Sequence, residues 1–424
     1  MAADPPLHGP ALDAARRRSQ FVLAGGVALT SVGQIAAFTV ATIAARALLG
    51  SNGLTGLPAA GYVLGSAAGS IGLAYLMSRT TRRLGLTVGF LGSVAGGAIA
   101  ALGVAIGSFL LLLLGMLLLG TGNSASQLSR YAAADMVPPA RRASAIGLVV
   151  WAATFGSVVG PQLVEPAGRL ATGAGVPELS GPLLVPIVFA GLATLLAFLF
   201  LRPDPYQLAH RVEPGSPGWD RTAAPIRQIV RRPAVLAAVA ALIVGQFTMT
   251  LIMTMTPLHM SQHGYGLGPV GLVLSAHTLG MFALSPVSGR LTGRLGALST
   301  IWLGTGILVA ASLMAAVAPP TAGLLLGVAL FLLGFGWNLG FVAGSSLLTS
   351  GLDVAERTRV QGLADGLIWT TAALASVGSG LVLQAAGFTT LGLLGAVVVL
   401  LPVWLFLTRR GAILAVAGAG RASS

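Results

Sequence analysis

Four side chains in the second half of the chain have the types and the spacing of a soft-metal site. Met249 and Met253 are four residues apart, and so are His277 and Met281. Side chains four residues apart lie on one face of a helix. If the two segments form an antiparallel hairpin that turns at "GYG" (264–266), residues whose numbers sum to about 530 lie at equal depth. Met253 then pairs with His277, and Met249 with Met281, so that three thioether sulfurs and one imidazole face a common point.

Such a ligand set has a chemical preference. Thioethers are soft donors that select Cu(I), whereas Mg²⁺ and Ca²⁺ prefer oxygen ligands. Five of the ten methionines and three of the five histidines lie between residues 246 and 281. Four of these side chains continue toward the end of the first segment, where they form a candidate capture site or relay for the ion: Met255, His259, Met260 and His263.

The elements that carry these residues are predicted to be membrane-spanning helices. The 424 residues are 55% hydrophobic and 8% charged, with a mean hydropathy of +0.88, whereas about 25% of residues are charged in soluble domains. Apolar runs long enough to cross the ~30 Å hydrocarbon core recur along the whole chain. We expect an all-α membrane protein with twelve spans, at 20–47, 56–78, 85–105, 108–132, 142–164, 182–201, 235–262, 267–288, 296–316, 321–347, 359–383 and 388–408.

The arginines predict the orientation of these spans. All 24 basic residues are arginine, and of those near the membrane only Arg46 and Arg169 fall clearly on the less basic side, with Arg130 near the end of the fourth span. Because cytoplasmic loops carry the excess of basic residues, both termini are expected to be cytoplasmic. The net charge of +13 is then a topology signal and does not indicate a nucleic-acid partner. The first apolar run is too long for a cleavable signal peptide.

An internal repeat divides the chain into two halves. The segment "AYLMSRTTRR" (74–83) aligns with "GRLTGRLGAL" (289–298) at an offset of 215 residues, which places Arg79 on Arg294. A polar segment that contains several prolines separates the halves and is predicted to be a linker. The expected organisation is a cytoplasmic tail (1–19), a six-helix bundle (20–201), a cytoplasmic linker (202–234), a second six-helix bundle (235–408) and a second tail (409–424).

The first repeated segment resembles the loop signature of the major facilitator superfamily, which reads roughly Gly-x-Leu-Ala-Asp-Arg-x-Gly-Arg-Arg. The matching residues are Leu76, Arg79, Arg82 and Arg83, and the replaced ones are Ala74, Ser78 and Thr81. The copy in the second half keeps Gly289, Leu291, Arg294 and Gly296. The resemblance implies two pseudo-symmetric bundles and a role for these residues in a cytoplasmic gate. Loop arginines that serve only as topology charges are the alternative.

The fifth span contains a second motif. "GSVVGP" (156–161) resembles the Gly-x-x-x-Gly-Pro motif of proton antiporters in the same superfamily. Gly156 and Gly160, one turn apart, allow two helices to approach closely, and Pro161 is expected to bend the backbone. Generic helix packing is the more economical reading of this motif, because similar glycine pairs occur elsewhere in the chain.

The methionine and histidine pairs also look like the signature of the CcoA-like copper importers of this superfamily, with Met249, Met253, His277 and Met281 at all four motif positions. The resemblance implies copper uptake across a bacterial inner membrane, with copper as a transported substrate and no permanently bound cofactor. The chain departs from that family in having no cysteine. Packing methionines around a generic polar cavity remain the alternative, although an intramembrane histidine usually faces a cavity.

Few other polar groups lie inside the predicted spans. Asp365, in the eleventh span, is a candidate for proton coupling, or else for an ion pair with a cytoplasmic arginine. The residues predicted to line a central cavity are Gln34, Tyr62, Gln246, Trp337 and Asn338. Applying the 215-residue offset to the candidate ligands gives Gln34, Phe38, Tyr62 and Ser66, so the metal site is not duplicated.

Together these features favour a secondary transporter that works by alternating access of two halves around a midplane site. Its predicted substrate is Cu(I), its partners are the metal ion and membrane lipids, and it is expected to be a monomer. A proton-coupled efflux antiporter for drugs or small metabolites is the second hypothesis. An enzyme is disfavoured, since the chain has no cysteine nucleophile and almost no carboxylate inside the predicted spans.

Overall fold

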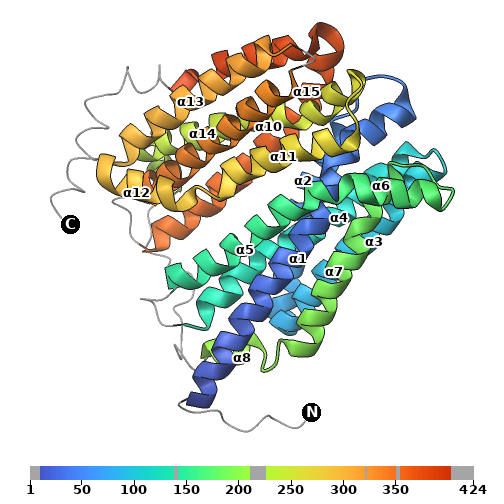
Figure 1. Ribbon diagram of the computed structural model, residues 1–424. Coiled ribbons are helices and arrows are strands. Elements are labelled where there is room, and N and C mark those ends of the chain that lie inside the picture. The colour runs from blue at the N-terminus through green and yellow to red at the C-terminus, as the bar shows by residue number, and fades with distance from the viewer. Residues whose placement is uncertain (1–9, 138–141, 211–225, 320–321, 350–353, 403–424) are drawn as a thin grey trace. The chain divides into compact units, whose positions relative to one another are not determined.

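The predicted all-helical fold is confirmed in the computed structural model, which describes residues 10–137, 142–210, 226–319, 322–349 and 354–402 (Figure 1). Every regular element of that part of the chain is a helix. The helices are α1 (Pro10–Leu49), α2 (Leu57–Arg79), α3 (Arg82–Ala105), α4 (Phe109–Asp135), α5 (Arg142–Gln162), α6 (Val164–Gly173), α7 (Ser180–Phe200), α8 (Pro205–His210), α9 (Ile226–Val230), α10 (Pro233–Gln262), α11 (Leu267–Phe282), α12 (Ser285–Leu295), α13 (Ala297–Val317), α14 (Gly323–Thr349) and α15 (Val354–Val398).

The predicted spans correspond to these helices. Within the described residues, ten helices are long and apolar enough to cross a membrane, and α5 with α6, bent by 45° at their junction, adds an eleventh. Helix α15 is interrupted at Gly387, whose φ of 79° is not helical. This glycine falls between the predicted spans 359–383 and 388–408, and the described residues show ten or eleven of the twelve expected spans. The predicted tail 409–424 and the end of the last span lie outside the described residues.

Two boundaries differ from the predicted spans for identifiable reasons. Helix α1 begins at Pro10, because the polar residues before the apolar run are mostly good helix formers and Asp13 in its first turn pairs with Arg16 at 3.5 Å. The eighth span is divided into α11 and α12, and α12 has Pro286 in its first turn. Proline lacks the N–H that a continuous helix would need at this position.

The helices pack into two units that repeat one arrangement. In unit 1, α1 packs against α4, α5 and α7, and α3 packs against α4 and α7. In unit 2, α10 packs against α14 and α15, and α13 packs against the same two helices. These pairs correspond under the 215-residue offset when α15 is counted as two spans. The repeat seen in the sequence is therefore a repeat of packing.

Two short segments do not pack with the half of the sequence that contains them. Residues 51–60 belong to unit 2, and residues 266–271 belong to unit 1. The 215-residue offset places the first segment on 266–275, so the two exceptions are themselves related by the repeat.

Glycines allow these two segments to approach a helix backbone. A methyl group on Gly56 would lie 1.7 Å from the main-chain oxygen of Ser376, and one on Gly271 would lie 2.3 Å from that of Pro161. Both the glycines and the oxygens are 215 residues apart in the sequence. The same close approach is thus built once in each unit.

The start of α3 is held by a side chain from beyond α7. The carboxylate of Asp204 accepts hydrogen bonds from the main-chain N–H groups of Arg82 (3.4 Å) and Arg83 (2.9 Å). The hydroxyl of Thr81 accepts the next one, from Leu84, at 3.1 Å. The first N–H groups of a helix have no partner within the helix, and an acidic group there also favours the helix dipole. Asp204 therefore joins the loop before α3 to the end of α7 within unit 1.

We expect Asp204→Ala to lower the stability of the protein by about 1 kcal/mol, because two N–H groups at the start of α3 lose their acceptor. The measurement is the thermal unfolding midpoint of the purified protein in detergent. Asp13→Ala is the control, since Asp13 is 64% exposed in a weak pair with Arg16 and exposed pairs contribute little. Equal shifts in the two variants would contradict this role of Asp204.

Candidate functional site

His277 is the central group of the candidate site in unit 2. It lies on α11 with no exposed surface, and its Nδ1 is 2.8 Å from the main-chain oxygen of Leu330 on α14. A carbonyl oxygen only accepts, so Nδ1 carries the proton and Nε2 carries a lone pair. Within the described residues, Nε2 is buried and has no hydrogen-bond partner. The packing of α14 thus presents His277 as an unsatisfied acceptor.

The three methionines of the predicted metal site come from the same pair of helices. Met249 is buried and Met253 half-buried on α10, and Met281 is half-buried on α11. The predicted hairpin is present, since α10 ends at Gln262 and α11 begins at Leu267. The turn contains a glycine with a φ of 84°. Coordination of one ion by these sulfurs and His277 stays a prediction.

The donor set restricts which metals suit this region. In the part of the chain that the structure describes, no group of three or more His, Cys, Asp or Glu side chains is placed to hold a metal ion. A metal near His277 would therefore depend on thioether sulfurs with one imidazole, a set that fits Cu(I) and does not fit hard cations.

The corresponding positions of unit 1 are brought into contact. The hydroxyl of Tyr62 donates to Oε1 of Gln34 at 3.2 Å, and the ring of Tyr62 meets that of Phe38 edge-on at 5.7 Å. The amide nitrogen of Gln34 is buried and lacks a partner among the described residues. A methyl group on Gly122 would lie 2.9 Å from this nitrogen and 2.6 Å from Cβ of Ser93, so the glycine lets α4 approach both side chains closely. Unit 1 therefore contains an unsatisfied donor where unit 2 contains an unsatisfied acceptor.

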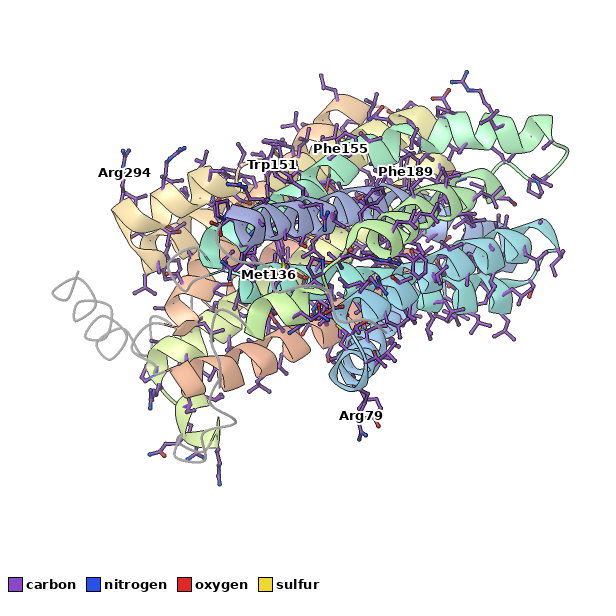
Figure 2. The ribbon with its side chains drawn as sticks, turned by 90° about the horizontal axis from the view of Figure 1, so that it is seen from below. Arg79, Met136, Trp151, Phe155, Phe189 and Arg294 are labelled. Carbon is purple, nitrogen blue, oxygen red and sulfur yellow. The ribbon has the colours of Figure 1, made fainter. Side chains whose placement is uncertain are left out.

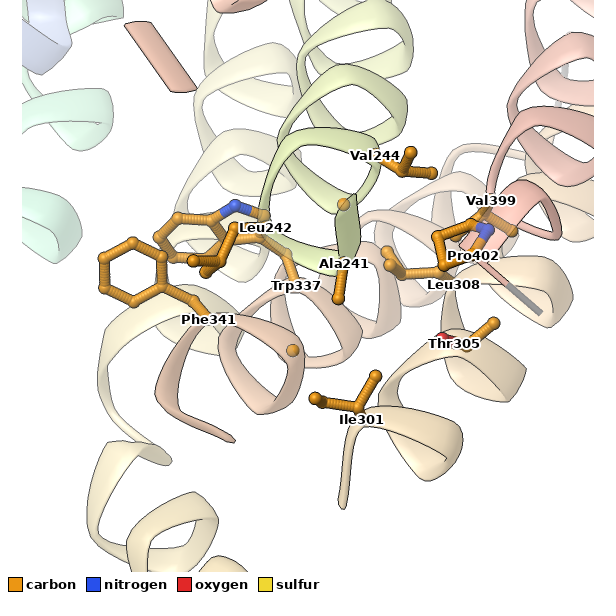
Figure 3. A pocket seen from close by; sticks show the side chains of 12 residues that line it. Ala241, Leu242, Val244, Ile301, Thr305, Leu308, Trp337, Phe341, Val399 and Pro402 are labelled. Atoms are coloured by element: carbon orange, nitrogen blue, oxygen red, sulfur yellow. The ribbon is translucent and has the colours of Figure 1, made fainter. Parts of the chain in front are cut away.

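Two more of the predicted cavity residues meet in unit 2. The indole N–H of Trp337 donates to Oε1 of Gln246 at 2.9 Å, and Nε2 of Gln246 lies 3.0 Å from the hydroxyl of Thr250. Trp337 also stacks on Phe341 at 4.9 Å. The pocket beside this stack, shown in Figure 3, has about 10 Å³ of free space. That is room for about one water molecule, so this pocket is too small to be the solute site.

Asn338, the last predicted cavity residue, is committed to the helix break in unit 2. Its amide nitrogen donates to the main-chain oxygen of Met281 at 2.7 Å and to the hydroxyl of Ser285 at 2.9 Å, and its oxygen accepts from Ser288. These three hydrogen bonds to the junction of α11 and α12 give Asn338 a structural role. It braces the position where proline interrupts the eighth span.

The four residues of the predicted relay have different surroundings. The sulfur of Met255 accepts from the hydroxyl of Thr55 at 3.6 Å, and both Met255 and Met260 are buried. His259 is half-buried, and His263 is exposed at the end of α10. The two methionines are therefore packed in the protein, whereas the histidines are accessible.

The residues of the loop signature lie at the ends of helices. Arg79 is exposed, with its guanidinium 5.2 Å above the ring of Tyr75, and Arg294 on α12 is also exposed. Both arginines point away from the helices that carry them (Figure 2). Arg82 and Arg83 begin α3, Gly289 lies on α12, and Asp365 is half-buried on α15. The gate and proton-coupling roles stay predictions.

The glycine motif of the fifth span forms a packing surface. A methyl group on Gly156 would lie 2.3 Å from Cβ of Ser31, and one on Gly160 would lie 2.7 Å from the main-chain oxygen of Val32. Both contacts are with α1. Pro161 lies in the last turn of α5, immediately before the 45° bend into α6. Both glycines therefore lie where α5 approaches α1 closely, and the bend follows Pro161.

Sequence reasoning did not identify several residues with a part in these regions. Leu330 supplies only its main-chain oxygen, for which no sequence signal exists. Trp151 and Phe155 on α5 are 67% and 56% exposed (Figure 2). Their four-residue spacing on an apolar helix is a signal that points to one exposed aromatic face. Such ring faces are able to meet lipid or a planar solute.

Comparison with known proteins gives a consistent result over nearly the whole chain. The sequence profile described as Major Facilitator Superfamily matches residues 22–377. The uncharacterized MFS-type transporter YdeG of Bacillus subtilis is 34% identical over 398 residues, covering 93% of this chain and 92% of YdeG. The riboflavin transporter RfnT of Brucella anthropi is 31% identical over 403 residues, covering 94% of this chain and 98% of RfnT.

Solved structures show the same fold at low sequence identity. The crystal structure of a bacterial homologue of the human lysosomal transporter Spinster, inward-facing and unoccupied, has a TM-score of 0.67 at 14% identity, covering 94% of this chain and 98% of that one. The human organic anion transporter MFSD10 has a TM-score of 0.61 at 18% identity, covering 94% of this chain and 100% of its own.

We expect Gly156→Ala to lower the thermal unfolding midpoint. Alanine normally stabilises a helix interior by about 1 kcal/mol relative to glycine, but overpacking at a contact this close typically costs about 1–3 kcal/mol. Gly147→Ala is the matched control on the same helix, because nothing lies within 4 Å of the added methyl group. If both substitutions raise the midpoint, α1 and α5 do not pack as described.

Proposed function

The chain belongs to the major facilitator superfamily and is a multi-pass membrane transporter, not an enzyme, and we propose that it carries a small heteroaromatic organic solute of the flavin type. We also propose that it acts as a monomer in the inner (cytoplasmic) membrane, with both termini in the cytoplasm and no permanently bound cofactor.

The observation that carries this proposal is a pair of buried polar atoms of opposite kind. The amide nitrogen of Gln34 is a donor without a partner, and Nε2 of His277 is an acceptor without a partner, among the residues that the structure describes. Leaving such groups unpaired in a low-dielectric interior costs free energy. A group that donates a hydrogen bond relieves the cost at Nε2 of His277 in unit 2, and a group that accepts one relieves the cost at the Gln34 nitrogen in unit 1. The imide edge of a flavin ring, with N–H flanked by C=O, is a group of this kind.

The other side chains predicted to line the cavity suit a neutral, planar solute. The polar side chains predicted to line the cavity, Gln34, Tyr62, Gln246 and Trp337, have amide, hydroxyl and indole groups without formal charge, and they are hydrogen-bonded in pairs. Aromatic rings provide flat apolar faces, and pockets for organic ligands combine such faces with a few polar groups. The similarity to the riboflavin transporter RfnT over 94% of the chain supports the same class of solute.

In this proposal, each polar atom that binds solute is oriented by a hydrogen bond to a neighbouring group, and that neighbouring group does not itself contact the solute. Tyr62 donates to Oε1 of Gln34 and so directs the amide nitrogen away from itself. Leu330 accepts from Nδ1 of His277 and so reserves Nε2 as an acceptor. Carriers of this fold bind their solute near the midplane and alternate access to it by moving one half against the other. Within unit 1 Tyr62 positions Gln34, and within unit 2 Leu330 positions His277.

Cu(I) is the second candidate substrate, and a specific observation favours it. Metal-binding histidines commonly donate their other ring N–H to a main-chain carbonyl, as His277 does to Leu330. Met249, Met253 and Met281 lie on the helices expected for thioether ligands. Copper is a partner for Nε2 of His277 only, whereas the imide edge of an organic solute carries both a donor and acceptors. The organic solute is therefore the first choice.

An efflux antiporter for drugs or metabolites is a related alternative. It would share the organic class of solute but move it outward. The glycine-proline motif that suggested it is explained by packing of α5 on α1. The direction of flux measured in oriented proteoliposomes distinguishes the two.

For the organic solute, the test is uptake of radiolabelled riboflavin by proteoliposomes that contain the purified protein. We expect Gln34→Leu and His277→Leu each to raise KM about fivefold, since each loses a hydrogen bond of roughly 1 kcal/mol. Gln262→Leu and His263→Leu are matched controls at the end of α10 and should leave KM unchanged. Uptake that is saturable but indifferent to Gln34 and His277 would exclude the proposed recognition.

For copper, the test is accumulation of radiolabelled copper in copper-limited cells that lack their own importer. Met249→Leu with Met281→Leu keeps the apolar volume and removes two sulfurs. We expect this double variant to retain riboflavin uptake, because thioethers play no part in recognition of the organic solute. Copper accumulation by the wild type that falls at least tenfold in the double variant, at equal expression, would move the assignment to Cu(I).

A further inference from the structure

Two further histidines, apart from His277, lie together at the end of α10. His259 lies in the last turn of α10, and His263 is the residue that caps the helix. Their imidazole rings lie next to each other, with centroids 4.4 Å apart and planes inclined by 55°. Histidines four residues apart on a helix face one way, and imidazole binds copper, nickel and zinc ions well.

Hydrogen bonding prepares one nitrogen of His263 as a ligand. Its Nδ1 lies 2.8 Å from the main-chain oxygen of His259. Because that oxygen only accepts, Nδ1 carries the proton and Nε2 carries the lone pair. The side chain of His263 is exposed, so an ion in solution can reach this lone pair.

The ring of His259 is held in place by a third aromatic side chain. It stacks on Phe388 with the centroids 4.2 Å apart and the planes inclined by only 10°. Phe388 is buried and follows Gly387, where α15 is interrupted. A ring that is already restrained loses less conformational entropy when it binds an ion. His259 is half-buried, so part of the residue is exposed to solvent.

We propose that His259 and His263 form a two-imidazole site for a divalent transition-metal ion such as Cu²⁺, Ni²⁺ or Zn²⁺. Water molecules complete the coordination, because no third His, Cys, Asp or Glu of the described chain joins the pair. The site is independent of the transported solute. Occupancy ties the last turn of α10 to the turn that leads into α11 and holds His259 against Phe388. Metal binding therefore stabilises this end of unit 2.

The experiment is a titration of Cu²⁺ into the purified full-length protein, followed by electron paramagnetic resonance, which detects nitrogen ligands. The purification tag contains no histidine, and His8 and His210 are replaced by glutamine, so that His259, His263 and His277 remain. We expect one bound Cu²⁺ per chain with two nitrogen ligands. His259→Gln and His263→Gln should each weaken binding by about tenfold or more.

Two control variants show whether the bound ion belongs to this pair of histidines. Gln262→Ala lies in the same turn and keeps both imidazoles, so it should bind Cu²⁺ as the parent protein does. His277→Leu removes the intramembrane imidazole and should also leave binding unchanged. Thermal unfolding without metal shows that each variant is folded, and added Cu²⁺ should raise the midpoint only where both His259 and His263 are present.

The proposal is overturned if the parent protein binds no Cu²⁺, or if binding is indifferent to both His259→Gln and His263→Gln. Loss of binding only in His277→Leu would also overturn it, because the ion would then belong to the intramembrane histidine. None of these outcomes depends on riboflavin or copper transport, so the test of this site is independent of the test of the proposed function.

Discussion

Hydrocarbon offers a polar group no hydrogen-bond partner, and this constraint governs the whole molecule. Every backbone N–H and C=O in a span must be satisfied within the protein, which is why each described regular element is a helix. Where the hydrogen-bond pattern of a helix is interrupted, side chains supply the missing hydrogen-bond partners. Asn338 and two serines bridge the junction of α11 and α12, and Asp204 with Thr81 covers the first N–H groups of α3. A buried polar atom that has no hydrogen-bond partner among the described residues is therefore a candidate binding group.

The two halves show how one packing arrangement supports different chemistry. Gln34 corresponds to Met249 and Tyr62 to His277 under the same offset that relates the helix pairs. Unit 1 joins its two residues by a hydrogen bond and leaves an amide donor. Unit 2 turns its histidine toward a neighbouring helix and leaves an acceptor. Since the packing is repeated and the polar side chains are not, each unit presents a different hydrogen-bonding group.

Much of the fold follows from the sequence because local patterns determine it. Apolar runs of the right length predicted the spans, and "GYG" (264–266) predicted the turn that follows α10. The candidate residues were found on the expected helices for the same reason. What the sequence did not predict depends on distant contacts: the carbonyl of Leu330, 53 residues from His277, fixes the tautomer, and Asp204 reaches α3 across 121 residues. The proposed organic solute was inferred from such contacts. The residue types alone had pointed to copper.

The positions of residues 51–60 and 266–271 impose an order on how the chain matures. Unit 1 contains residues 266–271, so its final packing waits until the ribosome has made residue 271 and α11 has begun to enter the membrane. Unit 2 needs residues 51–60, which were inserted long before. The first half of the protein is therefore synthesised early, but the packing of unit 1 is complete only when residues 266–271 have been added.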